Sequence, residues 1–293
     1  MKIGFLGTGL MGLPMAKRLI NANIPVIAYN RTTSKLQPLQ EMGAEITTEA
    51  AAAIKNSEGI ILMLSNAAAI EEVLLSPNSK LELQGKTIIQ MGTISPSQSI
   101  SISKKIMACG GEYLEAPVLG SIPEAETGKL IVMVGGNSQQ FEKWRILLKN
   151  FSPDPLFIGE IGTAAALKLA LNQLISALTS GFALSLGLVQ RQGVNVELFM
   201  QILRQSALYA PTFDKKLSRM LDRNYANPNF PSKHLLKDTK LFIDEAKLSG
   251  LNTSSSEGVL QILEMAVKMN LADGDYSALF SAINPEDTRT KDS

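Results

Sequence analysis

The sequence predicts an α/β fold in which a doubly wound parallel sheet is followed by an all-α domain that opens with one long helix. Three observations support this prediction. Short apolar runs alternate with helix-length segments in the first half of the chain, a glycine-rich turn at Gly7–Gly12 follows the first run, and strand patterns stop after about Gly159. We therefore divide the chain into a sheet domain at residues 1–161 and a helical domain at residues 162–293.

The predicted strands are short, continuous apolar runs, which are typical of strands buried on both faces of a sheet. They lie at Ile3–Leu6, Val26–Tyr29, Ile60–Leu64, Thr87–Gln90, Tyr113–Ala116 and Leu130–Val134. Most of them are separated by segments of helical length, which lie at Leu10–Ala22, Thr32–Met42, Ala67–Leu74, Ser95–Ala108 and Ser138–Asn150. Because parallel neighbours need such crossovers, we expect a parallel sheet covered by helices on both faces.

The predicted helices of the second domain lie at roughly 162–192, 195–206, 209–221, 232–249, 255–270 and 276–282. The first of them would extend about 45 Å at 1.5 Å per residue, which is enough to join the two domains as an interdomain helix. Its segment Ala164–Val189 is also long enough to span a bilayer. However, this segment holds Lys168, Asn172 and several hydroxyl side chains, and no basic cluster flanks it. We therefore expect a soluble protein without a membrane partner.

Composition narrows the function classes. Hydrophobic residues make up 45% of the chain, charged residues 19%, and the net charge is +1, so no strong field favours nucleic acid or an anionic membrane. Cys109 is the only cysteine, which excludes an internal disulfide and fits a reducing cytoplasm. His234 is the only histidine, so we expect no metal site built from soft ligands.

The turn Gly7-Thr8-Gly9-Leu10-Met11-Gly12 lies between a predicted strand and a predicted helix, which is the context of a Rossmann-type dinucleotide site. The first glycine allows the tight turn, the second lets the backbone approach a pyrophosphate, and the third lets helix and strand pack closely. The phosphates would meet free N–H groups at the helix N-terminus. The alternative is a glycine-rich turn that binds no ligand.

The second predicted strand ends at Tyr29 and is followed by Asn30, Arg31 and Thr32, with Lys35 close behind. A site that prefers NAD usually has an acidic residue here, which bonds the ribose hydroxyls. Arg31 can instead grip a 2′-phosphate through two parallel charge-assisted hydrogen bonds. We therefore expect NADP(H) to be preferred over NAD(H). A solvated surface charge is the alternative role of Arg31.

Further candidate residues follow the carboxyl ends of other predicted strands, where ligands bind in doubly wound sheets. Leu64 and Ser65 follow the third strand and Thr93 the fourth, so we expect them to line the nicotinamide side, with Thr93 near the substrate. Gly120 and Ser121 follow the fifth strand and can offer donors to a small carboxylate. A plain structural turn is the alternative for this last pair.

Lys168 and Asn172 are spaced at i and i+4 and therefore project from one face of the long helix. Lys168 is the only charged residue between Gly162 and Gln190. A helix face that met water would normally carry several charges, so a catalytic role is favoured. The alternative is a lysine that snorkels to water.

Motifs in both halves of the chain, from Met1 to about Ile283, resemble the β-hydroxyacid dehydrogenase family. This family includes 3-hydroxyisobutyrate dehydrogenases and glyoxylate/succinic semialdehyde reductases. The matching segments are Gly7 to Ala16, Ala116-Pro117-Val118-x-Gly120, Gly128-Lys129-Leu130, Gly159-x-x-Gly162 with Lys168 and Asn172, and Phe230-Pro231-x-Lys233-His234-x-x-Lys237-Asp238.

The resemblance implies a dinucleotide domain, an all-helical domain and a catalytic lysine at Lys168. Asn30-Arg31-Thr32 resembles the NADP-using branch, and Phe230 to Asp238 resembles the glyoxylate/succinic semialdehyde branch. By the same resemblance, Lys237 reaches the cofactor, and the residues facing substrate are Gly120, Ser121, Lys168, Asn172, Phe230 and Asp238. Two positions depart from the family pattern: Leu119 replaces a serine near the substrate, and Ala164 replaces a glycine.

The resulting expectation is a cytoplasmic, NADPH-dependent reductase of small carboxylate-bearing aldehydes such as succinic semialdehyde or glyoxylate. Lys168 would act as general acid, and Asn172 would hold Lys168 or the reacting oxygen. The alternatives are a 3-hydroxyisobutyrate or tartronate-semialdehyde type dehydrogenase and a non-catalytic dinucleotide-binding scaffold. Apolar C-terminal helices favour a homodimer or homotetramer.

Overall fold

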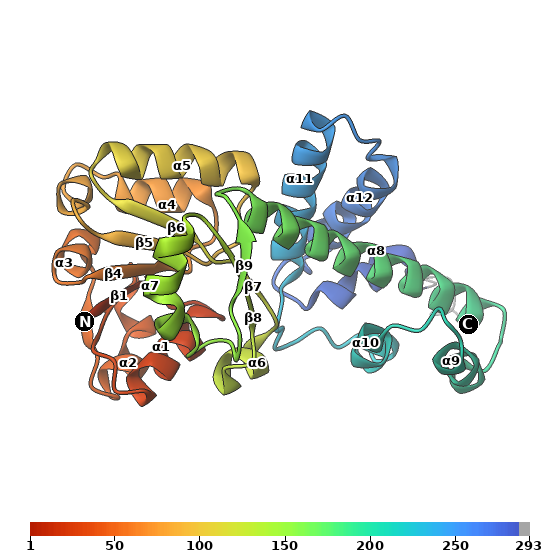
Figure 1. Ribbon diagram of the computed structural model, residues 1–293. Helices are drawn as coiled ribbons and strands as arrows, with labels where there is room; N and C mark the ends of the chain where they lie inside the picture. The colour runs from red at the N-terminus through yellow and green to blue at the C-terminus, as the bar shows by residue number, and fades with distance from the viewer. Residues whose placement is uncertain (287–293) are drawn as a thin grey trace. The chain divides into compact units, whose positions relative to one another are not determined.

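The computed structural model describes residues 1–286, and a nine-stranded sheet occupies the first half of the chain (Figure 1). The strand order is β3-β2-β1-β4-β5-β6-β8-β7, with β9 paired to β8. The strands are β1 Ile3–Leu6, β2 Val26–Tyr29, β3 Glu45–Thr47, β4 Gly59–Leu62, β5 Thr87–Gln90, β6 Glu112–Glu115, β7 Val118–Leu119, β8 Ile131–Gly135 and β9 Leu156–Gly159. The strands from β3 across to β6 are parallel, which confirms the predicted Rossmann-type sheet.

The sheet departs from the prediction at β8, which we expected to be parallel like the others. It runs antiparallel to β6, with Glu115 opposite Gly135, and antiparallel to β7, with Val118 opposite Val132. The link from β6 to β8 holds only the short β7 and the six-residue helix α6 (Ile122–Thr127). This link contains no helix long enough to carry the chain back along the sheet, as the crossover to a parallel neighbour requires.

Helices cover both faces of the sheet, with α4 and α5 on one face and α1 on the other (Figure 1). Together with α6, the helical elements of this half are α1 Gly12–Asn21, η1 Thr33–Lys35, α2 Gln37–Gln40, α3 Ala50–Lys55, α4 Ala67–Leu74, η2 Ser79–Glu82, α5 Pro96–Ala108 and α7 Ser138–Leu148. The single helix expected at Thr32–Met42 is divided into η1 and α2. Pro38 explains this division, because proline is tolerated in the first turn of a helix but not in its interior.

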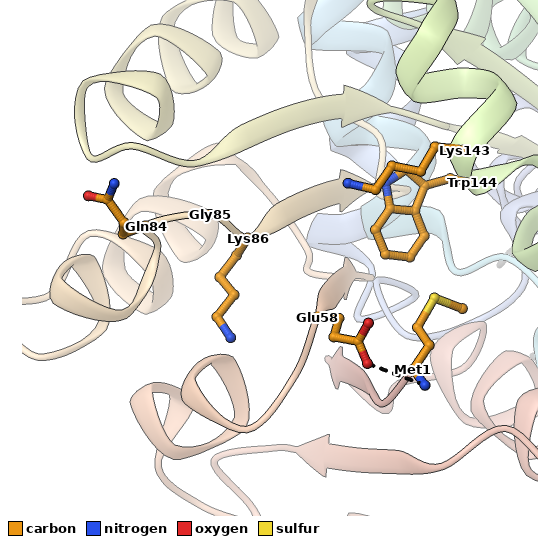
Figure 2. Close-up of a pocket in the computed structure, with 7 residues that line it drawn as sticks. All are labelled: Met1, Glu58, Gln84, Gly85, Lys86, Lys143 and Trp144. Carbon is orange, nitrogen blue, oxygen red and sulfur yellow. Dashed lines mark ion pairs between the residues drawn. The ribbon is translucent and has the colours of Figure 1, made fainter.

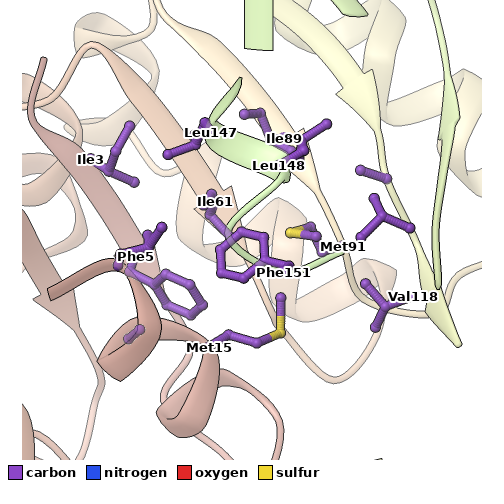
Figure 3. Close-up of a cluster of buried hydrophobic side chains, with 14 of the residues drawn as sticks. Ile3, Phe5, Met15, Ile61, Ile89, Met91, Val118, Leu147, Leu148 and Phe151 are labelled. Carbon is purple, nitrogen blue, oxygen red and sulfur yellow. The ribbon is translucent and has the colours of Figure 1, made fainter. Parts of the chain in front are cut away.

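Alternate residues of the central strands β1, β2, β4, β5 and β6 enter two separate cores. Ile61 of β4 packs in one core with Phe5, Met15 and Phe151, as Figure 3 shows, whereas Ile60 packs in the other core beneath α4 and α5. Because both faces of the sheet are buried, the strands hold the ends of the loops at the carboxyl edge in fixed positions.

The rest of the described chain is helical, as predicted, apart from an isolated bridge between Pro231 and Asp275. Its elements are α8 Thr163–Arg191, α9 Val196–Gln205, α10 Pro211–Leu221, α11 Ser232–Leu248, α12 Ser254–Lys268, η3 Tyr276–Ala278 and α13 Leu279–Ile283. Phe182 and Leu186 of α8 lie in the core of this part, together with Phe213 and Phe280.

The chain forms two compact units, which divide between Leu169 and Ala170, inside α8. By length and composition alone, α8 could cross a bilayer, but in this fold Phe182, Ala183 and Leu186 of α8 are buried in a protein core. Lys168 therefore belongs to the first unit and Asn172 to the second, although one continuous helix carries both.

Candidate functional site

Packing within the chain requires glycine at positions 7 and 12 of the glycine-rich turn but not at position 9. A Cβ on Gly7, whose φ is +104°, would lie 2.4 Å from the Met63 carbonyl oxygen. A Cβ on Gly12 would lie 1.9 Å from the Gly7 carbonyl oxygen. A Cβ on Gly9 would meet nothing within 4 Å. The glycine at position 9 is therefore not explained by packing within the chain, and it leaves open space beside the backbone, where a pyrophosphate could approach.

Helix α1 begins directly after this turn and has no side-chain cap. Its N-cap residue is Met11, whose side chain makes no capping hydrogen bond, and no acidic residue lies in the first turn. Leu10 is exposed beside it. An uncapped helix N-terminus next to an open glycine attracts an anion through its N–H groups and its dipole.

Asn30 ties the loop after β2 to the glycine-rich turn. Its Nδ2 donates to Thr8 Oγ1 at 2.9 Å, and its Oδ1 accepts from the Thr32 N–H at 2.9 Å. Thr8 Oγ1 in turn donates to the Lys35 carbonyl oxygen at 3.2 Å. Because an ionised aspartate cannot donate to Thr8, the amide of Asn30 supports this loop in a way that an acidic residue could not.

Arg31 lies on the surface, with its side chain 71% exposed and its Nη1 3.7 Å from Glu72 Oε1. An exposed pair at this distance contributes at most about 1 kcal/mol. The guanidinium can therefore exchange Glu72 for a phosphate at little cost. No pattern near Arg31 indicates this pair, because Glu72 lies 41 positions further along the chain.

The other predicted cofactor loops also follow the carboxyl ends of their strands. Leu64 and Ser65 come after β4, and half-buried Thr93 comes after β5. The loop after β5 is held by Gln90, whose side chain bonds both the N–H and the carbonyl of Gly92 at 2.7 and 2.8 Å. These loops share one edge of the sheet with the glycine-rich turn, because all four strands that precede them are parallel.

The turn before α6 uses its donors within the chain. The backbone N–H and the hydroxyl of Ser121 donate to Glu124 Oε2 at 2.8 and 2.6 Å. From the sequence, we expected these donors of Ser121, together with Gly120, to bind a substrate carboxylate. Glu124 was missed, although the Ser-x-x-Glu spacing is a recognised helix-start pattern.

The first turn of α8 is bonded to Glu115, which is 1% exposed at the end of β6. Its Oε1 accepts from the N–H groups of Gly162, Ala164 and Ala165 at 2.8, 2.9 and 3.2 Å. Its Oε2 accepts from Ser99 Oγ at 2.5 Å. Glu115 was not among the candidate residues expected from the sequence.

Burial raises the pKa of the Glu115 carboxyl, and the hydrogen bonds from Ser99 and from the backbone oppose that rise. Ser99 Oγ also lies 2.9 Å from the hydroxyl of buried Tyr113, so the carboxyl end of β6 carries a continuous buried hydrogen-bond network. Lys168 follows one helical turn after Ala164 and is 8% exposed.

In the second unit, Asn172 is 3% exposed and its Nδ2 donates to Asp238 Oδ2 at 2.7 Å. Because a carboxylate only accepts, the amide nitrogen must face Asp238, and the amide oxygen points elsewhere. Among the described residues, that buried oxygen has no hydrogen-bond partner. Lys237 Nζ lies 3.0 Å from Asp238 Oδ1 as an ion pair. The site therefore contains a fixed, buried acceptor, and leaving such an acceptor unpaired costs about 1–3 kcal/mol.

Phe230 and His234 lie just before Lys237 and Asp238 in the sequence and form an aromatic group. Their rings stack with centroids 6.3 Å apart, and Tyr276 meets Phe230 edge-on at 5.8 Å. Burial lowers the pKa of His234, and the charge of Lys237 lowers it further. The lowered pKa and the stacked ring fit a structural role for His234.

A pocket of about 300 Å³ lies elsewhere, at the amino ends of β1, β4 and β5 (Figure 2). Ligands of doubly wound sheets bind at the opposite edge. The cations here already have partners in the chain: the Met1 ammonium lies 3.2 Å from Glu58, and Lys86 Nζ donates to backbone carbonyls, including that of Lys55 at 3.0 Å. We therefore assign no function to it. Among residues 1–286, no cluster of His, Cys, Asp or Glu is placed to hold a metal ion.

Two family models match this chain, one over each part. Residues 2–159 match a family model described as the NAD binding domain of 6-phosphogluconate dehydrogenase. Residues 162–283 match one described as NAD-binding of NADP-dependent 3-hydroxyisobutyrate dehydrogenase.

Two Arabidopsis thaliana proteins are similar over almost the whole chain. Glyoxylate/succinic semialdehyde reductase 2, chloroplastic, is 32% identical over 98% of this chain and 80% of its own length. Glyoxylate/succinic semialdehyde reductase 1 is 30% identical over 97% of this chain and 98% of its own. A crystal structure of 3-hydroxyisobutyrate dehydrogenase from Salmonella typhimurium shares the fold, with a TM-score of 0.86, 21% identity and coverage of 96% and 99%.

Proposed function

The chain belongs to the β-hydroxyacid dehydrogenase family of NAD(P)-dependent oxidoreductases, and from that premise we propose that it is an NADPH-dependent reductase of small aldehyde acids. Succinic semialdehyde and glyoxylate are the proposed substrates, as the names of the two Arabidopsis relatives suggest. The observation that carries the proposal is on α8: a buried lysine, Lys168, lies one turn before Asn172, whose buried amide oxygen has no hydrogen-bond partner in residues 1–286.

The geometry of the sheet edge supports a dinucleotide with a 2′-phosphate. Gly9 leaves room for the pyrophosphate beside the uncapped start of α1. Arg31, exposed and weakly paired, is free to bind the 2′-phosphate, and no carboxylate of the strand end itself competes with it. When bound, the reduced nicotinamide supplies the hydride.

Lys168 completes the proposed reaction by supplying a proton. As the hydride bonds to the aldehyde carbon, the carbonyl π electrons move to oxygen. The Lys168 ammonium donates a proton to that oxygen, which gives the hydroxy acid and leaves a neutral amine that regains a proton from water. A group placed for this transfer contributes typically about 10²- to 10⁴-fold in rate.

Asn172 and Asp238 would orient the donor. Asp238 fixes the amide so that its oxygen can accept from the Lys168 ammonium or from the product hydroxyl. The substrate carboxylate would bind Gly120 and Ser121 after Glu124 has moved away from the Ser121 donors.

The proposal is tested by an absorbance assay of NADPH and NADH oxidation with succinic semialdehyde, glyoxylate and related aldehyde acids. Lys168→Ala should lower kcat by about 10²-fold or more while leaving NADPH binding unchanged. Lys233→Ala is the control, because that exposed lysine forms an ion pair with Asp273 on the surface. Turnover by Lys168→Ala at the wild-type rate would reject the role of the lysine.

The cofactor half is tested by Arg31→Ala. Loss of a two-bond contact with the 2′-phosphate should raise the KM for NADPH about 10-fold or more and leave that for NADH unchanged. Wild-type protein that oxidises NADH as well as NADPH would reject this half of the proposal.

A second candidate is a dehydrogenase of the 3-hydroxyisobutyrate or tartronate-semialdehyde type. The family model over residues 162–283, described as NAD-binding of NADP-dependent 3-hydroxyisobutyrate dehydrogenase, favours it. The same assay, run in the oxidative direction with 3-hydroxyisobutyrate, separates the two.

We also propose that the protein is a homodimer or homotetramer. Leu174, Leu178, Leu184 and Leu188 of α8 are exposed at helical spacing and form an apolar stripe. Stripes of this kind mark interaction surfaces. Light scattering should give a mass of two or four chains, and a mass of one chain would contradict the proposal.

A further inference from the structure

Helix α8 cannot cap its own N-terminus. It begins at Thr163, and the residue before it is Gly162, which has a φ of +102° and no side chain to accept a hydrogen bond. The first N–H groups of a helix have no partner within the helix, so they need an acceptor from elsewhere. Glu115 supplies that acceptor from 47 residues earlier, through the N–H of Gly162 and then through those of Ala164 and Ala165.

The position of this carboxylate is fixed from several sides. Glu115 ends β6, and its Oε2 accepts from Ser99 of α5. Gly135 lies opposite it on β8, and a Cβ there would come within 2.4 Å of Glu115 Oε1. The glycine therefore makes room for the carboxylate. Three elements of the sheet domain thus hold the group to which the start of α8 is bonded.

Lys168 depends on this anchor because it lies one turn after Ala164 on the same helix. If the first turn rotated or frayed, the Lys168 side chain would no longer point at the oxygen that it is proposed to protonate. A misplacement of about 1 Å can cost about 10²-fold in rate. We infer that Glu115 is a positioning residue for the reaction: it joins the first turn of α8 to the end of β6 and thereby fixes the direction of Lys168. This inference rests on the proposed function of Lys168.

Two substitutions separate the charge of Glu115 from its hydrogen bonds. In Glu115→Gln the amide nitrogen replaces Oε2, so that Ser99 Oγ accepts from it instead of donating. Glu115→Gln keeps an oxygen acceptor for the three N–H groups and removes the negative charge at the helix N-terminus. Glu115→Ala removes both. With kcat normalised to the number of NADPH-binding sites, we expect a loss of about 2- to 5-fold for Gln and about 30- to 100-fold for Ala, with the Kd for NADPH within about 2-fold of wild type. Partial unfolding would lower the number of binding sites instead.

Glu112→Gln is the matched control. Glu112 begins the same strand and accepts from Thr87 at 2.6 Å and Lys143 at 3.4 Å, at the opposite end from Glu115. It should leave kcat unchanged. Amide hydrogen exchange provides a second measurement that does not need turnover: exchange at Gly162, Ala164 and Ala165 should accelerate in Glu115→Ala and remain slow in Glu112→Gln.

The outcomes are distinct. Wild-type kcat per binding site in Glu115→Ala overturns the inference, whether or not exchange accelerates, and so does unchanged exchange. If wild-type protein reduces no aldehyde acid, the proposed function fails, while the exchange data still decide whether Glu115 anchors α8. If Glu115→Ala does not fold, Ser99→Ala replaces it. Loss of the Ser99 donor to Glu115 Oε2 should lower kcat by about 2- to 5-fold, and no loss would overturn the inference.

Discussion

A carboxylate is bonded to α8 on each side of Lys168, and the two bonds differ in kind. Glu115, in the first unit, accepts from backbone N–H groups one turn before the lysine. Asp238, in the second unit, accepts from the side chain of Asn172 one turn after it. Backbone donors tie the helix to the sheet. The Asn172 amide donates through its nitrogen, so its oxygen remains as an acceptor. That oxygen is suited to accept a hydrogen bond from a lysine or a substrate.

From this difference we propose that the contact between Asn172 and Asp238 takes part in the reaction, whereas the contact between Glu115 and the start of α8 supports the helix. Removing Asn172 should therefore cost more activity than neutralising Glu115.

Asn172→Ala should lower kcat by about 10²-fold, because the amide oxygen that orients the proton donor is lost. Stability should change little. The substitution removes a buried acceptor that has no partner among residues 1–286, but it also takes one donor from Asp238. Steady-state kinetics and urea unfolding measure the two effects. A kcat loss smaller than that of Glu115→Gln would reverse the comparison.

Glu124→Ala should lower the KM for aldehyde acids by about 5- to 10-fold, since the N–H and hydroxyl of Ser121 would become free for the substrate carboxylate. The KM for NADPH should not change. Loss of the helix-start contact should cost about 1 kcal/mol of stability. A higher KM for the aldehyde acid would show instead that Glu124 contributes to substrate binding.

Glu115→Gln should change how stability depends on pH. The pKa of Glu115 is raised in the folded state by burial, so the folded protein holds this proton more tightly than the unfolded chain does. Stability from this group is complete below its ordinary pKa of 4.5 and is lost as pH rises through the folded pKa. Wild type should therefore lose stability relative to Glu115→Gln as pH increases above 4.5. Urea unfolding from pH 4.5 to 7.5 measures the difference, and parallel curves would contradict the prediction.

His234 should show the opposite slope in the second unit. Burial lowers its pKa from 6.5, so stability from this group is complete above pH 6.5 and is lost as pH falls through the folded pKa. The chain has one histidine, so a single imidazole resonance reports the titration directly by NMR. A midpoint at or above 6.5 would be inconsistent with this, and His234→Gln should remove the slope.

Much of the sheet could be predicted from sequence. The bounds of β1, β2 and β5 coincide with the predicted runs, because strands buried on both faces are continuously apolar. The edge strand β3 was missed, since Glu45–Thr47 is short, polar and partly exposed. The antiparallel direction of β8 was also missed, because it depends on how the connection from β6 folds and not on the strand's own residues.

The candidate site divides in the same way. The glycine-rich turn, Arg31 and the Lys168–Asn172 spacing follow from short patterns. The acceptors that hold them do not: Glu115, Glu124 and Asp238 were found as hydrogen-bond partners only in the structure. Glu124 alone had a local pattern that could have revealed it.

By itself, the sequence determined the order of the main strands and helices, the glycines of the first turn and the placing of a lysine and an asparagine on one helical face. Backbone sterics and helical periodicity act over a few residues, so they can be read locally. Only the tertiary structure decided that Glu115 meets the start of α8 and that Asn172 meets Asp238, 66 residues away. Such partners are fixed when packed elements exclude water and leave each buried donor with one acceptor within reach.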